Sequence, residues 1–124
     1  MKQGRKISGG RYRKFRKKKF YERKGEVRIV RLAPLKRKKI RTKGGKIKIV
    51  LLSTNEAYVF NKKTKSSKKA KITNVLETPS NKFLARQNIL LKGAIIETEL
   101  GKAKITNRPS QEGSLQATLI EEQK

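Results

Sequence analysis

The 124-residue sequence contains no cysteine and no histidine. Without cysteine, the chain can form no disulfide, no thiolate nucleophile and no cysteine-ligated zinc site. Without histidine, it has no imidazole to bind a metal or to act as a general base near neutral pH. Both absences argue against metal-dependent chemistry, and we expect no cofactor and no bound metal.

Acidic residues are also few, at nine Asp and Glu. Glu97 and Glu99 lie on one face of an expected strand, but no partner base is available, so we interpret them as a solvated face and not as a catalytic pair. Neither a Walker-type phosphate loop nor a dinucleotide-binding glycine pattern occurs. We therefore expect no enzymatic activity and no small-molecule substrate; an RNA-modifying factor is a remote alternative.

Long hydrophobic runs are missing as well. No stretch approaches the roughly 20 apolar residues that a membrane helix needs, and the basic region has no continuous apolar face to lie in a membrane interface. The first ten residues lack the apolar core of a secretory signal. We expect one domain, located in the cytoplasm, with no membrane partner.

What the sequence has in excess is positive charge. Its 35 Lys and Arg give a formal net charge of +26 and a pI of about 10.9. A free globular protein gains nothing from such a charge, because like charges repel one another when the chain compacts. Binding to nucleic acid reverses this effect, since each phosphate neutralised by Lys or Arg releases condensed counterions. The composition therefore indicates a nucleic-acid-binding protein.

The positive charge is concentrated at the front of the chain. Residues 1–50 hold 22 Lys and Arg against 2 acidic residues, whereas residues 83–124 hold 6 against 5. Residues 1–24 contain too few apolar side chains to offset the ordering of their backbone, which costs about 1 to 2 kcal/mol per residue. We divide the chain at Gly25 and predict that residues 1–24 are a basic RNA-binding extension, disordered when free and ordered on binding.

After Gly25 the chain consists of short runs rich in Ile, Val and Thr, separated by Gly, Asn, Ser and Pro, which is typical of strands and turns. We predict an all-β, small six-stranded barrel-like domain over residues 25–124. Its expected strand segments lie in residues 27–33, 46–53 continuing through a turn at 55–56 into 57–60, 71–78, 94–100, 102–106 and 115–120. The lysine-rich segments 35–46 and 61–71 are interpreted as basic loops projecting from the barrel.

Paired glycines occur twice among the cations. Gly9 and Gly10 would let phosphates approach the backbone N–H groups, because no Cβ stands in the way. A flexible linker is the alternative reading, although the flanking charge is denser than a neutral tether needs. Gly44 and Gly45 predict a hairpin turn that can also place the neighbouring cations against a groove.

Aromatic side chains alternate with cations between Arg11 and Tyr21. Unpaired bases stack on aromatic faces at roughly 1 to 3 kcal/mol per base, so Tyr12 and Phe15 are predicted to contact RNA. For Phe20 and Tyr21, docking against the barrel is an equally good alternative. The lysines of residues 62–71 are explained as well by a solvated, mobile charge run as by ordered binding.

Three segments resemble the S8e family of archaeal and eukaryotic small-subunit ribosomal proteins, in the compact archaeal form. They are residues 5–11 with 17–25, residues 41–46, and residues 91–103 with the following Asn107-Arg108-Pro109 and Gln111-Glu112-Gly113. Two positions depart from the family pattern: Lys46 replaces the usual Asn, and Arg23-Lys24-Gly25 replaces a Leu-Gly-Arg-like sequence. The resemblance implies a β-barrel whose extension and loops contact small-subunit ribosomal RNA, and a structural role beside neighbouring ribosomal proteins.

These arguments together predict one set of RNA-binding residues, with no catalytic and no metal-binding residue. A nonspecific nucleic-acid-coating, chromatin-like protein is the alternative function. The predicted residues are Lys2, Arg5, Lys6, Gly9, Gly10, Arg11, Tyr12, Arg13, Lys14, Phe15, Arg16, Lys17, Lys18, Lys19, Arg23, Lys24, Lys36, Arg37, Lys38, Lys39, Arg41, Lys43, Gly44, Gly45, Lys46, Lys48, Lys62, Lys63, Lys65, Lys68 and Lys69.

Overall fold

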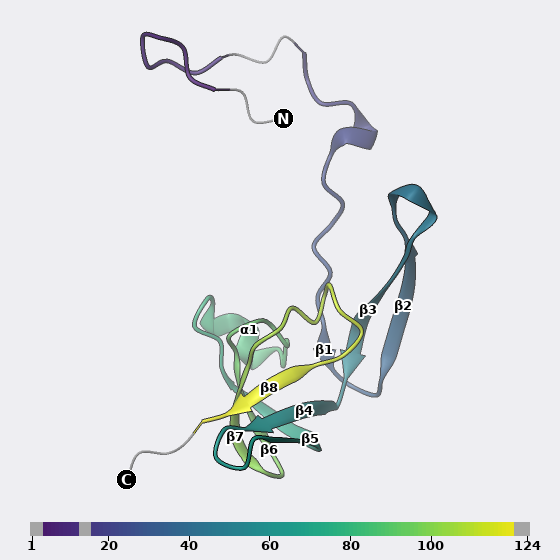
Figure 1. Cartoon of the computed structure of the whole chain (residues 1–124), viewed down its shortest axis with the longest axis vertical. Coiled ribbons are helices and arrows are strands. Elements are labelled where there is room, and N and C mark those ends of the chain that lie inside the picture. The colour runs from purple at the N-terminus through teal and green to yellow at the C-terminus, as the bar shows by residue number, and fades with distance from the viewer. Residues whose placement is uncertain (1–3, 13–15, 121–124) are drawn as a thin grey trace.

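The computed structural model describes residues 4–12 and 16–120 (Figure 1). The predicted all-β fold class is confirmed, although the described residues form eight strands where the sequence predicts six. The strands are β1 (Arg31–Leu32), β2 (Lys36–Arg41), β3 (Ile47–Thr54), β4 (Glu56–Asn61), β5 (Ser66–Glu77), β6 (Ile95–Thr98), β7 (Gly101–Ile105) and β8 (Gln116–Leu119). The helical elements are the short helix α1 (Lys82–Arg86) and two 3-10 turns, η1 (Phe20–Glu22) and η2 (Lys43–Gly45).

Five strands form a closed barrel in the order β4-β5-β6-β7-β8. Neighbouring strands are antiparallel except β4 and β8, whose parallel pairing closes the barrel. Small and large residues face one another across the strands, as where Ala103 lies opposite Ile96 and Ala117 lies opposite both Val59 and Ile105. The interior of a small barrel is filled by side chains, so small residues opposite large ones leave room for the larger side chains.

Strand periodicity decides which side chains enter the core. In β4, Ala57 and Val59 are buried while Tyr58 and Phe60, which alternate with them, face outward, because successive strand residues point to opposite faces. Residues outside the barrel strands complete the same core, including Val30, Leu51, Ala85, Leu90 and Leu115.

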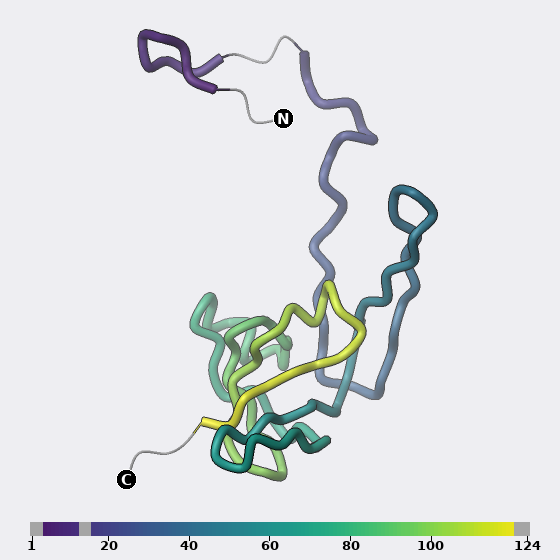
Figure 2. Tube along the Cα trace, viewed as in Figure 1, coloured from purple at the N-terminus to yellow at the C-terminus, as the bar shows by residue number. Residues whose placement is uncertain are grey.

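The remaining strands form a second sheet in the order β1-β3-β2, with β1 parallel and β2 antiparallel to β3. From Val50 onward β3 is buried except for half-buried Leu52, with Val50 and Leu51 at 0 % and 1 % exposure. Residues 47–49 are exposed except for half-buried Lys48 and pair with the end of β2. We call residues 36–50 the arm, because they stand away from the barrel as a two-stranded projection (Figure 2).

The predicted strands 46–53, 57–60 and 115–120 are confirmed by β3, β4 and β8, and the hairpin predicted over residues 94–106 is confirmed by β6 and β7. Glu99 and Leu100 form the turn of that hairpin, and the Gly101 backbone that follows has a φ of 113°, which favours glycine.

Three sequence predictions are wrong in detail. Residues 35–46 are not a loop, since Lys36–Arg41 is a strand. Residues 61–71 are a loop only to residue 65, because β5 begins at Ser66. In the run 27–33, only Arg31–Leu32 pairs as a strand, and helix α1, capped at its start by the Asn81 side chain, was not foreseen. Lysine-rich strands are difficult to predict from sequence, because strand propensity depends on the partner strand and on exposure.

Candidate nucleic-acid interface

The arm carries cations without acidic neighbours in the sequence. Between Glu26 and Glu56 the chain holds ten Lys and Arg and no Asp or Glu. Strand β2 lies opposite β3 so that Arg37, Lys39 and Arg41 share one face, and every β2 residue except half-buried Ile40 is exposed. Side chains on one face of a strand repeat about every 6.8 Å. The three cations therefore form a regular, solvent-facing row.

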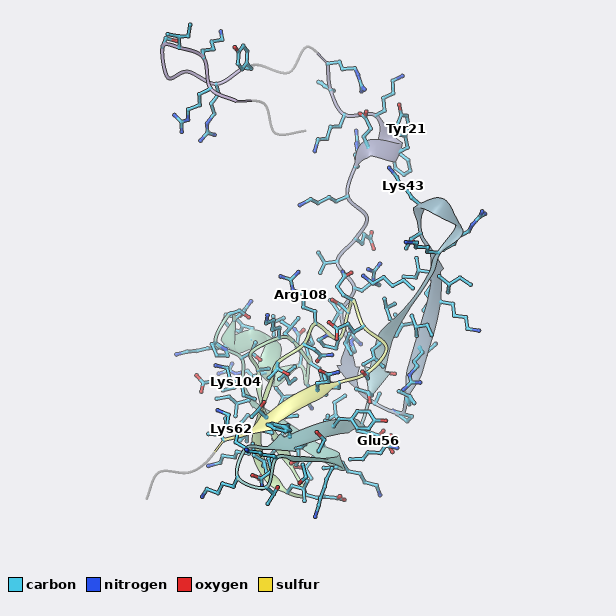
Figure 3. The ribbon with its side chains drawn as sticks, viewed as in Figure 1. Tyr21, Lys43, Glu56, Lys62, Lys104 and Arg108 are labelled. Carbon is cyan, nitrogen blue, oxygen red and sulfur yellow. The ribbon has the colours of Figure 1, made fainter. Side chains whose placement is uncertain are left out.

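Two glycines form the tip of the arm. Gly44 and Gly45 have φ values of 76° and 75°, a region that other residues rarely adopt, so the turn itself requires glycine. The Lys46 carbonyl closes the turn by accepting hydrogen bonds from the Thr42 N–H at 2.7 Å and the Thr42 hydroxyl at 2.9 Å. Lys43 stands at this far end of the arm (Figure 3).

The base of the arm is held by residues 107–113, which we call the root clamp. The Leu51 N–H donates to the carbonyls of Pro109 and Glu112, at 3.2 and 3.1 Å. The Lys48 ammonium donates to the Gln111 side chain at 2.6 Å. Lys48, predicted to bind RNA, is thus half-buried and engaged with the clamp, so its first role in the structure is to fix the direction of the arm.

The root clamp also contacts the chain ahead of β1 and is held in shape by Asn107. The Arg28 guanidinium donates to the Ser110 carbonyl at 3.2 Å. The Asn107 amide donates to the Glu112 carboxylate at 2.8 Å and to the Ser114 carbonyl at 2.7 Å, while its oxygen accepts the Gln116 N–H at 3.0 Å. The root clamp therefore positions the arm. This gives a structural role to a segment that is itself not densely charged but lies beside the cationic arm.

The described residues ahead of the barrel, 4–12 and 16–27, are exposed throughout. Arg5 and Arg11 form an isolated antiparallel bridge around a turn in which Gly9 has a φ of 78°, so this glycine is needed for its conformation. The Lys6 ammonium lies 5.8 Å from the centre of the Tyr12 ring, a cation–π arrangement. The segment between Arg5 and Arg11 is therefore a tight cationic turn and not an extended tether.

A second turn follows near η1. The Arg16 guanidinium makes two 2.7 Å bonds to the Glu22 carboxylate, which lower the pKa of Glu22 and raise the pKa of Arg16. Arg16, predicted to bind RNA, is thus already ion-paired. Phe20 and Tyr21 are 87 % and 75 % exposed, so neither ring is docked on the barrel in this structure.

The hairpin between β4 and β5 carries a third group of cations: Lys62, Lys63, Lys65, Lys68 and Lys69. All five are exposed. Lys69 is ion-paired with Glu56 at 2.7 Å, and this hydrogen bond raises the Lys69 pKa. Lys62 lies on the opposite side of the barrel from Lys43 at the arm tip (Figure 3). The hairpin turn and the arm tip are therefore far apart, whereas Lys69 lines the same hollow as Arg37 near the base of the arm.

Four predicted residues, Lys2, Arg13, Lys14 and Phe15, lie outside the described part of the chain. All the other predicted residues are exposed except Lys48. Arg108 was missed, although it is an exposed cation in the root clamp beside the base of the arm (Figure 3). Its place in the Asn107-Arg108-Pro109 sequence, one of the segments that resemble the S8e family, was the signal available.

Two further observations concern residues 4–12 and 16–120 only. Within these ranges, no three His, Cys, Asp or Glu side chains come close enough together to hold a metal ion. No helix in the same ranges has the length and apolar character needed to cross a lipid bilayer.

The fold and the charge distribution define a small β-barrel protein with strongly cationic projections. A family model described as ribosomal protein S8e matches residues 1–120. Relatives named small ribosomal subunit protein eS8 include those of Sulfurisphaera tokodaii (45 % identical over 95 % of this chain and 93 % of the relative) and Nanoarchaeum equitans (46 % identical over 93 % and 91 %). The relative from Methanococcus maripaludis strain S2 is 48 % identical over 71 % of this chain and 69 % of its own length. The chain belongs to the ribosomal protein S8e family, which confirms the resemblance seen in its sequence.

Proposed function

We propose that the chain is a structural constituent of the small subunit of the cytoplasmic ribosome, where it binds and stabilises ribosomal RNA. The observation that carries this proposal is the arm: an exposed row of cations without acidic neighbours in the sequence, held rigidly at its root. Such a projection places fixed positive charge at a distance from the body, as a protein inserted between RNA segments requires. Membership of a ribosomal protein family and eS8 relatives support the same role.

The arrangement favours a scaffold in which the barrel keeps two cationic groups apart. The arm and the β4–β5 hairpin lie on opposite sides of the barrel, so each neutralises the phosphates of a different RNA segment (Figure 3). The extension of residues 1–24 adds further cations and becomes ordered as it binds. Neighbouring ribosomal proteins are further partners, and the chain performs no catalysis of its own.

Neutralising the arm tests this role. In the variant Arg37→Gln/Lys39→Gln/Arg41→Gln, we expect the affinity for small-subunit ribosomal RNA to fall about tenfold or more at moderate salt. The slope of log K against log salt should become shallower by about 0.7 to 0.9 for each lost phosphate contact. Filter binding over a salt series measures both quantities.

The variant Lys62→Gln/Lys65→Gln/Lys68→Gln removes the same charge from the hairpin that we assign to a second RNA segment, and it should weaken binding as well. The matched control is Lys71→Gln/Lys82→Gln/Arg86→Gln, at three exposed cations outside the predicted set. Competition with excess unrelated RNA separates specific binding from the chromatin-like alternative. If unrelated RNA displaces ribosomal RNA completely, or if the chain fails to cosediment with small subunits through a high-salt wash, the ribosomal role is wrong.

A further inference from the structure

Two aromatic side chains face solvent on the outside of the barrel, where polar residues are expected. Tyr58 is 48 % exposed and Phe60 is 38 % exposed. Neither ring supports the core, because Ala57 and Val59 supply the buried side of the same strand at 1 % exposure each. Both aromatics therefore stand on one outer face, two residues apart, about 6.8 Å along the strand.

The strand register surrounds the two rings with hydrogen-bonding groups. Tyr58 lies between Gln116 of β8 and Lys69 of β5, and Phe60 lies between Thr118 and Ser67 of the same two strands. Directly opposing residues on paired strands point to the same face. A surface groove of about 510 Å³ lies along this face and is lined by Tyr58, Phe60, Ser67, Thr106, Gln116, Ala117 and Thr118.

Cations lie at both margins of this groove. Lys69 stands directly opposite Tyr58, held by its ion pair with Glu56. Lys104 of β7 lies opposite Thr118 at the other margin, and Lys62 follows Phe60 by two residues in the hairpin turn (Figure 3). The face thus combines flat aromatic surfaces, amide and hydroxyl groups, and positive charge within a few side chains of one another.

We propose that this face, defined by Tyr58, Phe60, Ser67, Gln116 and Thr118 with Lys69 and Lys104 at its margins, binds two unpaired nucleotides of ribosomal RNA. Each ring stacks on one base, the amide and hydroxyl groups bond the base edges, and the lysines contact the flanking phosphates. Unpaired bases are recognised in this way, whereas a duplex hides its base faces and offers only phosphates and groove edges. The inference rests on the proposed RNA-binding function and names a contact of a different kind, stacking in place of charge neutralisation.

The first test removes the two rings from the full-length chain. The variant Tyr58→Thr/Phe60→Thr replaces the two aromatic residues by β-branched ones, which also favour strands. The control is Leu100→Thr, which removes an apolar side chain of 43 % exposure from the β6–β7 turn. We expect the affinity for a 12-nucleotide single-stranded RNA to fall about tenfold or more. Affinity for a 12-base-pair RNA duplex and the salt slope should stay unchanged, because no cation has been removed. Fluorescence anisotropy measures all three quantities.

The second test does not depend on the double variant folding. The sequence has no tryptophan, so Tyr58→Trp places a single indole on the proposed platform, and Leu100→Trp places one at a control site of similar exposure. Single-stranded RNA should quench the indole at position 58 and leave that at position 100 nearly unchanged, whereas duplex RNA should quench neither. Equal quenching at both positions, or none at position 58, would overturn the proposal.

The outcomes separate this inference from the proposed function. If wild-type chain binds small-subunit ribosomal RNA with a steep salt dependence while the aromatic variant binds single-stranded RNA unchanged, the platform is wrong and the ribosomal role stands. If the variant keeps its RNA affinity but no longer enters small subunits, the face contacts a protein, which also contradicts base stacking. If wild-type chain shows no preference for ribosomal RNA, the ribosomal role itself fails.

Discussion

Isoleucines in the barrel and in the arm have the same local structure and opposite surroundings. Ile96 of β6 and Ile105 of β7 are 0 % and 1 % exposed inside the barrel, whereas Ile47 and Ile49 of β3 are 69 % and 45 % exposed on the arm. The barrel strands bury their apolar side chains against one another and so stabilise the fold. The arm gains little from burial and instead presents cations. The comparison shows that the chain places its apolar strand residues in the barrel and its exposed cations on the arm.

A two-stranded projection of this kind is marginally stable by itself. Here its long strand β3 continues into the core, where Val50 and Leu51 are buried, and the root clamp bonds the same stretch through Pro109 and Glu112. The direction of the arm therefore depends on contacts at its base, because little holds it along its length.

The largest expected effect is the loss of stability on truncating a buried isoleucine of the barrel, compared with an exposed isoleucine of the arm. Ile96→Ala should lower the free energy of unfolding by about 2 to 5 kcal/mol, because it removes buried methyl groups and leaves a cavity in a narrow barrel. Thermal or urea unfolding measures the change. The matched variant Ile47→Ala, in the exposed half of β3, should remain within about 0.5 kcal/mol of the parent. Similar losses in both variants would mean that the arm is part of the folding core.

Deleting residues 1–24 should change binding and leave stability nearly intact. We expect the affinity for ribosomal RNA to fall about 100-fold or more at moderate salt, equivalent to about 2.7 kcal/mol, because the many cations of this segment each release counterions on binding. Filter binding measures the affinity, and circular dichroism with a thermal scan measures the fold. A domain that unfolds on this truncation would show that the division at Gly25 is misplaced.

The smallest expected effect is the loss of stability on substituting Gly113, which lies where the root clamp meets the arm. A Cβ added at Gly113 would lie 2.9 Å from Ile49 Cγ2 and 3.4 Å from Ile49 Cβ. Gly113→Ala should therefore destabilise the protein by about 1 to 2 kcal/mol through overpacking at the root of the arm. Unfolding measurements test the loss, and NMR shifts in β2 and β3 report displacement of the arm.

Relief of that clash provides the control. Adding Ile49→Ala to Gly113→Ala should restore part of the lost stability, since the clashing side chain is removed and the two residues are in contact. Additive losses in the double variant would show that the clamp does not act through this contact.

Much of the fold and part of the candidate interface followed from the sequence. Ile, Val and Thr at alternate positions marked β3, β4, β8 and the hairpin from β6 to β7, because those strands have one buried face and the alternation records it. Strands β2 and the first part of β5 were missed, since nearly all their side chains are charged or polar and exposed, and only their pairing with apolar neighbours makes them strands.

The candidate interface was likewise predicted only in part. Its cations could be named from their density, but their grouping on two sides of the barrel depends on contacts between residues far apart in the chain. The role of the root clamp could not be predicted from the sequence either, since its partners Arg28, Lys48 and Leu51 lie more than 50 positions earlier in the chain.

The sequence by itself determined the β class, the strongly cationic first half, the resemblance to a ribosomal protein family and the lack of cysteine and histidine, because these follow from composition and from local residue order. Only the tertiary structure decided that β4 pairs in parallel with β8 to close the barrel and that a lysine-rich segment becomes a strand of the arm. It also decided that Tyr58 and Phe60 share an outer face with residues of β5, β7 and β8. The physical reason is that strand pairing joins segments distant in sequence, so the neighbours of a side chain are set by register and closure and not by the residues beside it in the chain.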